Sequence, residues 1–539
     1  MKLLIIDGFV DEPTCLGVPP YLSTYIRYTA GAAFLAGIKE ISYRTILQLR
    51  ESSYIISPTD FAVIIAGNPV PGKYLGGKPI ELYEIEEIAG KNKKTRIFIG
   101  GPIQFEKINF KNQNIFLIEK DIEAFIYDYF SFSKTEFRYR TIEELNSFAI
   151  NGSFIVEQHP RHPDIIVEIE TSRGCPRKIH CSFCIEGLYN PEFRKPLDII
   201  NEIKSLASFG IRHFRLGKQA DIYSYMADMS TIKDGFPRPQ PENLRMLYEG
   251  IRDNIPQLET LHLDNVNPGT IAKFPVESQR ITEIIVKNNT AGDVAAMGME
   301  SADPVVVEKN FLKASPDEVY FAIRLINEIG GIREDGIPKL LPGLNFIKGL
   351  AGESRETFKK NYEFLKKVKD DGLLLRRINI RQLKISPHTY IASHTSKGKN
   401  EPILDAIFKK YREKIRNEID NYMLKQIFPV GLSLKNLIVE TNRGDWSLAR
   451  QIGTYPITVN IPRRLNLLEK IDAFILSHRE RSIVGLIFPF NLSLASLREI
   501  EQIPGVGKKA TEFFIDRSRF INEIKNLPVY KLIKESLIE

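Results

Sequence analysis

Short apolar runs alternate with longer amphipathic stretches over the first 130 residues. The apolar runs are residues 2–7 (KLLIID), 61–67, 96–101 and 115–119. They are short, rich in β-branched residues and apolar at consecutive positions, as strands buried on both faces of a parallel sheet are. Helix-length stretches lie between them, at residues 21–35 and 80–89. The alternation predicts a doubly wound α/β sheet over residues 1–135, with ligand-binding loops at 7–20 and 67–77.

The alternation resumes on a larger scale after a predicted linker at residues 136–163. Six further apolar runs alternate with amphipathic stretches, at residues 164–170, 213–217, 260–265, 294–300, 344–350 and 376–385. Repeated strand–helix units of this kind predict a partial or full parallel barrel over residues 164–395. The working loops of such a barrel follow the C-terminal ends of its strands, so the loop after the first strand is expected on the functional face.

Beyond residue 395 the pattern changes. Residues 396–430 predict a charged, amphipathic helical connector, and residues 431–490 predict short strands joined by turns, as in a small antiparallel β-barrel. Such a barrel resembles the TRAM and oligonucleotide-binding folds that are appended to RNA-modifying enzymes. A β-domain that only packs on the core is the alternative.

The last segment, residues 491–539, contains a pattern of helix, glycine turn and helix around the stretch IPGVGKK. This pattern resembles a helix–hairpin–helix. Gly505 and Gly507 permit a tight turn and close backbone approach. Backbone N–H groups beside Lys508 and Lys509 would then bind a nucleic-acid phosphate without reading sequence. A purely structural helical hairpin is the alternative.

Composition is that of an ordinary globular protein with several domains, at 43% apolar and 26% charged residues. The net charge of +7 is a mild basic bias that permits a polyanionic partner without requiring one. No run of about 18 apolar residues predicts a membrane span. The N-terminal stretch lacks the basic flank and cleavage site of a signal peptide. We therefore expect a cytoplasmic protein with no membrane partner and with reduced thiols.

Cysteine is concentrated in one loop. Three of the four cysteines in the chain, Cys175, Cys181 and Cys184, lie in the stretch ETSRGCPRKIHCSFC, directly after the strand predicted at 164–170. Three clustered thiols and a distant Cys15 do not form the dense, even-numbered pattern of a disulfide framework. Cys15 is expected to be a small apolar residue. Clustered reduced thiols indicate metal binding or catalysis, and together with His180 they match the donor set of a tetrahedral zinc site.

The cysteine loop resembles the cluster loop of the radical S-adenosylmethionine superfamily, and the resemblance covers residues 150–395. It includes an aromatic residue, Phe183, just before the last cysteine. The family spacing of three and then two residues between cysteines is replaced here by five and then two. The resemblance implies that Cys175, Cys181 and Cys184 bind three irons of a [4Fe–4S] cluster. The fourth iron would chelate the amino and carboxylate groups of S-adenosylmethionine.

Three further segments resemble motifs of this superfamily in the expected order. Residues 215–221 (RLGKQAD) take the place of the glycine-rich motif for the methionyl amino group, without its usual Gly-Gly-Glu. Residues 298–310 resemble the ribose-binding segment of tRNA methylthiotransferase-type members, and residues 346–365 resemble the glycine motif that packs on adenine. The cofactor-binding residues that this resemblance implies are Phe183, Gly217, Lys218, Gln219, Glu300, Ser301 and Gly349. Strand-end turn or capping roles are the alternative for Gly217 and Glu300.

The N-terminal sheet resembles the cobalamin-binding domain that precedes the core in many members. It contains no D-x-H-x-x-G motif, and the first histidine in the chain is His159, so cobalt cannot receive an imidazole from this domain. Members that bind cobalamin without that ligand exist, so cobalamin stays open beside a vestigial or substrate-binding sheet. A second cluster, as in methylthiotransferases, is not expected because Cys15 is the only cysteine there.

The resemblance implies that an electron donor reduces the cluster and that S-adenosylmethionine is cleaved to a 5′-deoxyadenosyl radical, which abstracts hydrogen from a substrate carbon. The whole arrangement resembles a mainly archaeal group of radical enzymes with a C-terminal helix–hairpin–helix. Its tail favours RNA, either tRNA or rRNA, as the partner, with methylation as one outcome. One alternative is a radical enzyme acting on a small molecule or lipid with a structural tail. Another is a non-catalytic, zinc-bearing nucleic-acid-binding protein.

Overall fold

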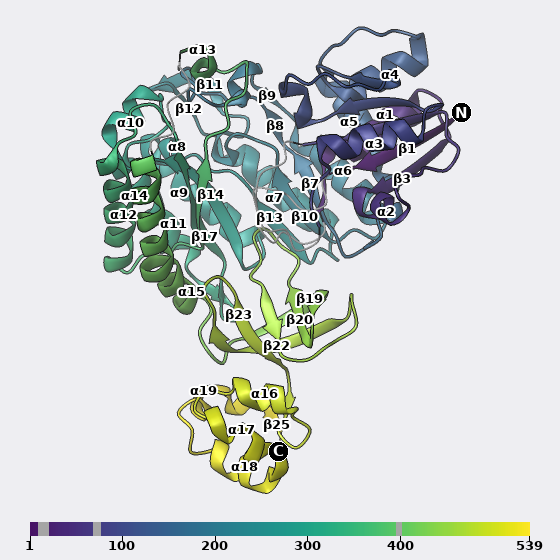
Figure 1. The fold of residues 1–539 in the computed structure, drawn as a ribbon. Helices are drawn as coiled ribbons and strands as arrows, with labels where there is room; N and C mark the ends of the chain where they lie inside the picture. Colours follow the sequence, from purple (N-terminus) through teal and green to yellow (C-terminus); the bar gives the residue numbers. More distant parts are fainter. Residues whose placement is uncertain (9–20, 68–76, 395–401, 539) are drawn as a thin grey trace.

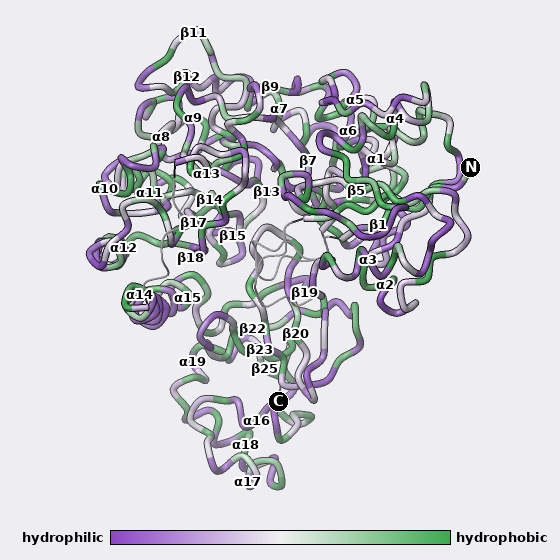
Figure 2. The backbone as a smooth tube through the Cα atoms, turned by 45° about the horizontal axis from the view of Figure 1, so that its top comes forward, coloured by the Kyte–Doolittle hydropathy of each residue, from purple (hydrophilic) through white to green (hydrophobic). Residues whose placement is uncertain are grey.

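The computed structural model of the protein describes residues 1–8, 21–67, 77–394 and 402–538. The chain forms an N-terminal sheet, a core of parallel strands wrapped by helices, a small β-barrel and a helical tail (Figure 1). Hydrophobic positions concentrate along the strands, whereas the outer helices alternate between hydrophobic and hydrophilic positions (Figure 2). The expected loops at 7–20 and 67–77, and Cys15, lie almost entirely outside the described residues.

The N-terminal sheet is doubly wound, as predicted. Its five parallel strands follow the order β3 (Glu40–Thr45), β1 (Lys2–Asp7), β4 (Phe61–Ile65), β5 (Arg96–Gly100) and β6 (Ile115–Leu117). One face packs on α3 (Leu82–Lys91) and the other on α1 (Thr24–Leu35) and α4 (Ile122–Phe132). The order reverses between β1 and β4, which is where such sheets bind ligands beyond their C-terminal edge.

The core is a partial barrel with the six predicted strands. They are β7 (Ile166–Glu170), β10 (His213–Gly217), β13 (Thr260–Leu263), β14 (Asp293–Glu300), β17 (Leu340–Lys348) and β18 (Arg377–Gln382). The first three and the last three form separate parallel sheets, which meet at a bridge between Val266 and Met297. The outer layer consists of α6 (Pro196–Ser208), α7 (Pro241–Asn254), α9 (Pro275–Asn288), α11 (Pro316–Gly330) and α12 (Arg355–Asp370).

Two expectations about the N-terminal region are wrong. Tyr21–Leu22 is not the start of a helix but a short strand, β2, which pairs in parallel with β7 at the edge of the core sheet. Residues 136–163 are not a linker, because they form α5 (Ile142–Asn151) and a 3₁₀ turn that pack on α1. A Cβ added at Gly152 would lie 1.8 Å from the Arg27 carbonyl oxygen, so the chain there is clamped against α1.

The C-terminal β-domain is a closed barrel of five strands. Their order is β19 (Ser433–Arg443), β20 (Trp446–Arg450), β21 (Val459–Ile461), β23 (Ile483–Ile487) and β22 (Lys470–His478). A helical segment, α14 (Pro402–Ile415), a π-helical turn and α15 (Asn421–Ile427), leads into this barrel along α12. The barrel covers the N-terminal ends of the core strands, where Lys470 pairs with Asp164 at 2.8 Å.

The tail forms short helices that pack on one end of this barrel, farthest from the core (Figure 1). These helices are α16 (Leu497–Gln502), α17 (Ala510–Ile515), α18 (Arg517–Ile524) and α19 (Tyr530–Ile533). Gly505 and Gly507 lie in the turn between α16 and α17 with positive φ, and Lys508 and Lys509 follow on the exposed surface. The cysteine loop lies at the opposite end of the core from this tail.

Candidate functional site

The three clustered cysteines lie in one loop that a short ribbon closes at its base. β8 (Ser172–Arg173) pairs antiparallel with β9 (Glu192–Phe193), so residues 174–191 form a single excursion beyond the end of β7. Gly174 opens the excursion with φ +78°. A Cβ at this position would lie 2.8 Å from two carbonyl oxygens of the returning chain. Glycine is therefore required where the two sides of the loop cross.

All three thiols are free and half-buried. The backbone N–H of Cys175 donates to the Glu186 carbonyl at 3.2 Å, and that of Cys184 donates to the Cys181 carbonyl at 3.0 Å. Burial raises the pKa of the Cys175 thiol, and burial together with Cys181 raises the pKa of Cys184 to about 12. Without a cation these two thiols stay protonated at neutral pH, so metal binding must displace their protons.

His180 does not complete a zinc site. Its Nε2 lies 3.2 Å from the Cys175 carbonyl oxygen, and its ring packs on Gly187. In the described part of the chain, no three His, Cys, Asp or Glu side chains are grouped to hold a single metal ion. A tetrahedral zinc would bring its thiolates within about 4 Å of one another. Three thiols in one loop are soft ligands of the kind that hold an iron–sulfur cluster.

Two cations that the sequence reasoning missed face the cysteines. Lys313 Nζ lies 3.4 Å from Glu300 Oε1. Burial lowers the pKa of Lys313, but Glu300 and the thiols of Cys181 and Cys184 outweigh burial and raise it. Arg177 Nη1 approaches the Cys181 sulfur at 3.5 Å. These charges would offset the negative charge of a thiolate-bound cluster. Lys313 lies just beyond the motif at 298–310, and no recognised pattern marks it.

Glu300 ends β14 with an oxygen that has no partner. Its carboxylate is buried, and Oε2 has no hydrogen bond among the described residues. A Cβ added at Gly298 would lie 2.2 Å from Glu300 Oε1 and 2.3 Å from Lys313 Nζ, so this glycine makes room for the pair. A buried acceptor at the C-terminal end of a core strand suits a hydroxyl donor such as ribose. This geometry fits the expected nucleoside site.

The Ser301 hydroxyl makes local contacts beside Glu300. It accepts from the Asp303 backbone N–H at 3.1 Å and lies 3.5 Å from Asn361 Oδ1, within the turn that begins α10 (Pro304–Lys309). Asn361 also accepts from the Ala302 backbone N–H at 2.6 Å. The serine therefore shapes the loop after Glu300, and its oxygen is already engaged there.

Phe183 and Gly349 both adjoin one apolar cluster beside the cysteines. Cys181 and Phe183 pack on an apolar cluster formed by Val306 of α10, Leu312 in the loop after α10, and Leu350 just after β17. Gly349 follows β17 with φ +97°, and its N–H donates to Glu353 at 3.0 Å. The structure thus brings the cysteine loop together with the ends of the fourth and fifth core strands.

The side chains of the residues around the end of β10 contact two different parts of the molecule. Gln219 is buried beside the base of the cysteine loop, where Thr171 Oγ1 donates to its Oε1 at 3.4 Å. Lys218 instead pairs with Glu170 at 3.3 Å and lies over the Tyr25 ring of α1 at 3.8 Å. A Cβ at Gly217 would lie 2.7 Å from Glu168 Oε1. Lys218 therefore belongs to the contact between the core and the N-terminal domain.

That contact is a buried charge junction, which the sequence reasoning also missed. Arg140 binds Glu170 at 2.6 Å, Asp121 at 3.1 Å and Glu123 at 3.2 Å. Arg173, at the base of the cysteine loop, binds Asp121 through both carboxylate oxygens at 2.8 and 3.0 Å. Asp121 precedes α4 at the C-terminal edge of the N-terminal sheet. The C-terminal edge of that sheet is thereby fixed against the cysteine loop.

A second contact aligns the same two edges. Glu106, beyond the end of β5, pairs with Lys384, beyond the end of β18, at 2.9 Å. Phe105 also meets the Tyr189 ring of the cysteine loop, with centroids 6.5 Å apart. The C-terminal edges of the N-terminal sheet and of the core therefore face each other.

The C-terminal barrel inserts a side chain into the core from the other end. Tyr455 packs on Tyr21, Ile166 and Val294, which face the inside of the partial barrel, and its hydroxyl donates to Asp264 at 3.1 Å. Arg377 lies over its ring at 4.0 Å. Tyr455 has φ +56°, a conformation that a bulky residue adopts only when its surroundings hold it. It forms the floor of the core's interior.

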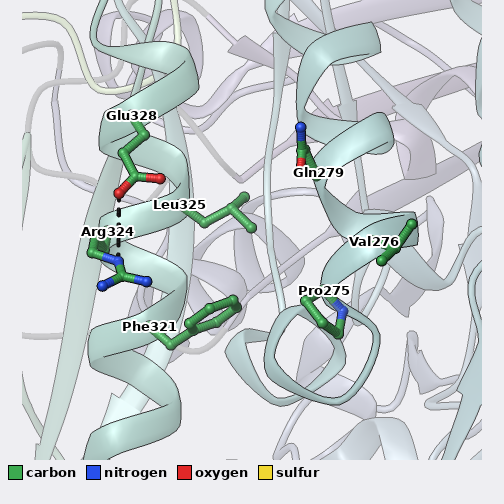
Figure 3. A pocket seen from close by; sticks show the side chains of 7 residues that line it. All are labelled: Pro275, Val276, Gln279, Phe321, Arg324, Leu325 and Glu328. Atoms are coloured by element: carbon green, nitrogen blue, oxygen red, sulfur yellow. Dashed lines mark ion pairs between the residues drawn. The ribbon is translucent and has the colours of Figure 1, made fainter.

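One surface cavity of about 230 Å³ lies elsewhere, between α9 and α11 (Figure 3). Its lining is Pro275, Val276, Gln279, Phe321, Arg324, Leu325 and Glu328. Arg324 and Glu328 form an ion pair at 3.4 Å along α11. This cavity lies in the outer helical layer and contains none of the predicted site residues.

No family model matches the chain. The chain is 43% identical over 524 residues to an uncharacterized protein of Archaeoglobus fulgidus, covering 96% of this chain and 95% of that one. It is 40% identical over 533 residues to an uncharacterized protein of Methanocaldococcus jannaschii, covering 94% and 95%. The protein belongs to the same family as these two archaeal proteins.

More distant similarities are partial. The ribosomal protein uS12 methylthiotransferase RimO of Phocaeicola vulgatus is 26% identical over 227 residues, which is 42% of this chain and 46% of RimO. Among solved structures, the radical S-adenosylmethionine methyltransferase TsrM of Kitasatospora setae has a TM-score of 0.49 in two forms. One form, with tryptophan and an S-adenosylmethionine analogue, is 12% identical and covers 72% of this chain and 75% of TsrM. The other, with cobalamin and a [4Fe–4S] cluster, is 13% identical and covers 73% and 74%.

No helix in the described ranges combines the length and the apolar character that crossing a bilayer requires.

Proposed function

We propose that this protein is a radical S-adenosylmethionine enzyme whose [4Fe–4S] cluster is bound by Cys175, Cys181 and Cys184. The observation that carries the proposal is the arrangement of three free thiols opposite Glu300 and Lys313 at the C-terminal edge of a partial barrel. A mononuclear zinc site is disfavoured, because the Nε2 of His180 is engaged by the Cys175 carbonyl oxygen, 3.2 Å away.

When bound, the reduced cluster and S-adenosylmethionine supply the 5′-deoxyadenosyl radical. The residues of this chain bind, orient and shield the reacting groups. Glu300 Oε2 would accept a hydrogen bond from a ribose hydroxyl. Phe183 and the apolar cluster of Val306, Leu312 and Leu350 would exclude water from one side of the site. Lys313 and Arg177 would hold positive charge near the cluster and the methionyl carboxylate. Gln219, at the base of the loop, is the remaining candidate for the amino group.

The N-terminal sheet is the proposed site of a second ligand. Its C-terminal edge is fixed against the cysteine loop by Arg140 and Arg173, so its ligand would lie beside the radical site. Cobalamin is one candidate, with methyl transfer as the corresponding reaction, and it would be held without a histidine from this domain. Part of the substrate is the other candidate. Cobalt content after growth with cobalamin separates them.

RNA is the proposed substrate class. Its support is a closed five-stranded barrel followed by a glycine turn with exposed Lys508 and Lys509. These elements lie at the opposite end of the core from the cysteine loop, so they would anchor a substrate long enough to span the core. A tRNA or an rRNA segment meets this requirement, whereas a small molecule does not need such an anchor. A small-molecule or lipid substrate with a structural tail is the competing proposal.

The enzyme proposal is tested by product formation. Anaerobically reconstituted protein, given a strong reductant and S-adenosylmethionine, is expected to form 5′-deoxyadenosine slowly even without substrate. Glu300→Gln is expected to weaken this reaction while the absorbance of the cluster is retained, because Glu300 contacts nucleoside and not iron. No 5′-deoxyadenosine from protein with a full iron complement would overturn the proposal. Nucleoside mass spectrometry of tRNA and rRNA from a deletion strain tests the RNA substrate separately.

A further inference from the structure

Two loops of the C-terminal barrel, far apart in sequence, meet at the only tryptophan in the chain. Trp446 begins β20, directly after the turn at residues 444–445 that joins β19 to β20. Arg479 begins the turn at residues 479–482 that joins β22 to β23. The Arg479 guanidinium carbon lies 4.5 Å from the centre of the Trp446 ring, which places a cation over an aromatic face.

The position of this pair matches the binding surface of its fold. Barrels of five strands that bind oligonucleotides use the face of strands two and three with the loops one–two and four–five. In this barrel, strands two and three are β20 and β21, and the two loops are those at residues 444–445 and 479–482. Arg479 Nη1 also lies 3.4 Å from Asn460 on β21, so its side chain spans both strands of that face.

The pair lies on the open part of the barrel. The other end of β20 packs on the core, where Arg450 pairs with Glu440 and Arg161 lies 3.6 Å from the same carboxylate. Arg479 is exposed and Trp446 is half-buried, so the guanidinium presents its outer face to solvent. A backbone hydrogen bond from Arg479 N to Ser482 O, at 2.8 Å, holds the turn that carries it. The platform is therefore both accessible and held in place.

The surroundings are positively charged. Arg443 and Arg464 lie beside the first loop, whereas Arg481 of the second loop lines a separate recess with Asp420. In the described ranges, neither Arg443, Arg464 nor Arg479 has a carboxylate within ion-pair distance. The two acids nearby are already faced by other arginines, since Asp445 pairs with Arg498 at 2.7 Å and Glu480 lies 3.9 Å from Arg416. The net excess of positive charge suits a phosphate backbone.

We propose that this surface binds single-stranded RNA, with a base stacked on the Arg479–Trp446 platform and phosphates bound by Arg443 and Arg464. Bases of single strands stack on aromatic rings and on guanidinium planes, and such stacking tolerates any sequence. An acidic peptide would satisfy the charges but not the flat stacked surface. The inference rests on RNA being the substrate, and it assigns the anchoring contact to the barrel, independently of the glycine turn in the tail.

The single tryptophan makes the test specific to this position. A short mixed-sequence single-stranded RNA is titrated into the full-length protein while tryptophan emission is recorded. We expect saturable quenching whose midpoint moves to higher RNA concentration as salt is raised. Duplex RNA and poly-glutamate are the comparison ligands, and both are expected to quench less. Equal quenching by poly-glutamate would mean a general polyanion surface and would overturn the proposal.

Variants separate stacking from charge. Binding is measured by anisotropy of labelled RNA, and folding by thermal melting. Arg479→Ala and Trp446→Leu are each expected to weaken binding on the order of tenfold, since each removes half of the platform. Arg479→Lys keeps the charge but loses the planar stack, so it is expected to weaken binding as well. Arg324→Ala, which removes one exposed arginine on α11, is the matched control and should bind as the parent does.

Folded variants at Arg479 that bind RNA as tightly as Arg324→Ala would refute the platform. The outcome is independent of the enzyme proposal, because iron content and S-adenosylmethionine cleavage are measured on the same parent preparation. Cleavage without RNA binding would refute this inference alone. RNA binding with quenching but without iron or cleavage would refute the radical-enzyme proposal alone.

Discussion

Replacing Arg140 with methionine tests how the N-terminal domain is held against the cysteine loop. The Arg140 side chain is 3% exposed and contacts three carboxylates, those of Asp121, Glu123 and Glu170. Methionine fills much of the volume but leaves these acids short of a positive charge in a buried site. Removing one partner of a buried ion pair costs about 3–5 kcal/mol. Arg173 and Lys218 still face Asp121 and Glu170, so we expect the lower part of this range.

The loss is expected to depend on pH, because one of the three acids can neutralise itself. Burial and the charge of Asp121 raise the pKa of Glu123 to about 7. A carboxyl whose pKa is raised by folding contributes stability that is present at low pH and is lost as the pH rises through the raised pKa. Arg140 opposes this shift in the parent, so its removal raises the pKa of Glu123 further. The variant is therefore expected to lose least near pH 5 and most near pH 8.

The full-length protein is unfolded with urea at about pH 5 and at about pH 8, and the unfolding is monitored by far-UV circular dichroism. Arg138→Met is the matched control. Arg138 lies two residues before Arg140 and pairs with two acids, Asp128 and Glu144, but its side chain is 34% exposed. Pairs of that kind contribute about 0–1 kcal/mol. The reasoning is refuted if Arg140→Met costs no more than Arg138→Met, or if its cost is the same at both pH values.

Three further predictions concern the site and the tail. Cys→Ala at 175, 181 or 184 is expected to abolish binding of about four irons per chain, whereas Cys15→Ala should retain it; iron analysis showing four irons in any of the three variants would contradict the assignment. Gly298→Ala is expected to weaken S-adenosylmethionine binding, measured by equilibrium dialysis, on the order of tenfold, because the added Cβ would displace the side-chain ends of Glu300 and Lys313; unchanged affinity would place the nucleoside elsewhere. Lys508→Glu combined with Lys509→Glu is expected to weaken binding to RNA of any sequence and to reduce the salt dependence of binding. Lys531→Glu combined with Lys534→Glu is the charge-matched control in the same tail. If both double variants bind RNA equally well, the glycine turn has only a structural role.

Local sequence patterns predicted the elements whose structure depends mainly on their own residues. Consecutive β-branched residues such as those at 2–7 and 61–67 identified buried strands, and the loop after residue 170 followed from the chain order of strands and cysteines. Helix α5 was missed although its start carries a readable signal, since Thr141 and Glu144 form a capping box. The two-residue strand β2 could not be predicted, because it exists only through its pairing with β7, more than a hundred residues away.

In the candidate site too, sequence patterns predicted some of the residues and missed others. The cysteines and Glu300 occur in recognisable stretches, and the structure places them at one edge of the core. Cys181 and Cys184, which face Lys313, and Glu170, which pairs with Arg140, lie far along the chain or in another domain, so neither cation has a sequence signature. Tyr455 reaches the interior of the core only because the C-terminal barrel packs on the N-terminal ends of the core strands. Lys218 lies in a recognisable motif, yet its ammonium group pairs with Glu170 at the junction between domains.

Electron paramagnetic resonance of the reduced, anaerobically prepared protein, recorded with and without S-adenosylmethionine, tests the central claim most directly. Three cysteine ligands leave one iron of a [4Fe–4S] cluster without a protein thiolate, so the cofactor is expected to bind that iron and change the signal. The account predicts a reduced-cluster spectrum that shifts when S-adenosylmethionine is added. Stoichiometric zinc with no iron, or a cluster signal that S-adenosylmethionine leaves unchanged, would contradict it.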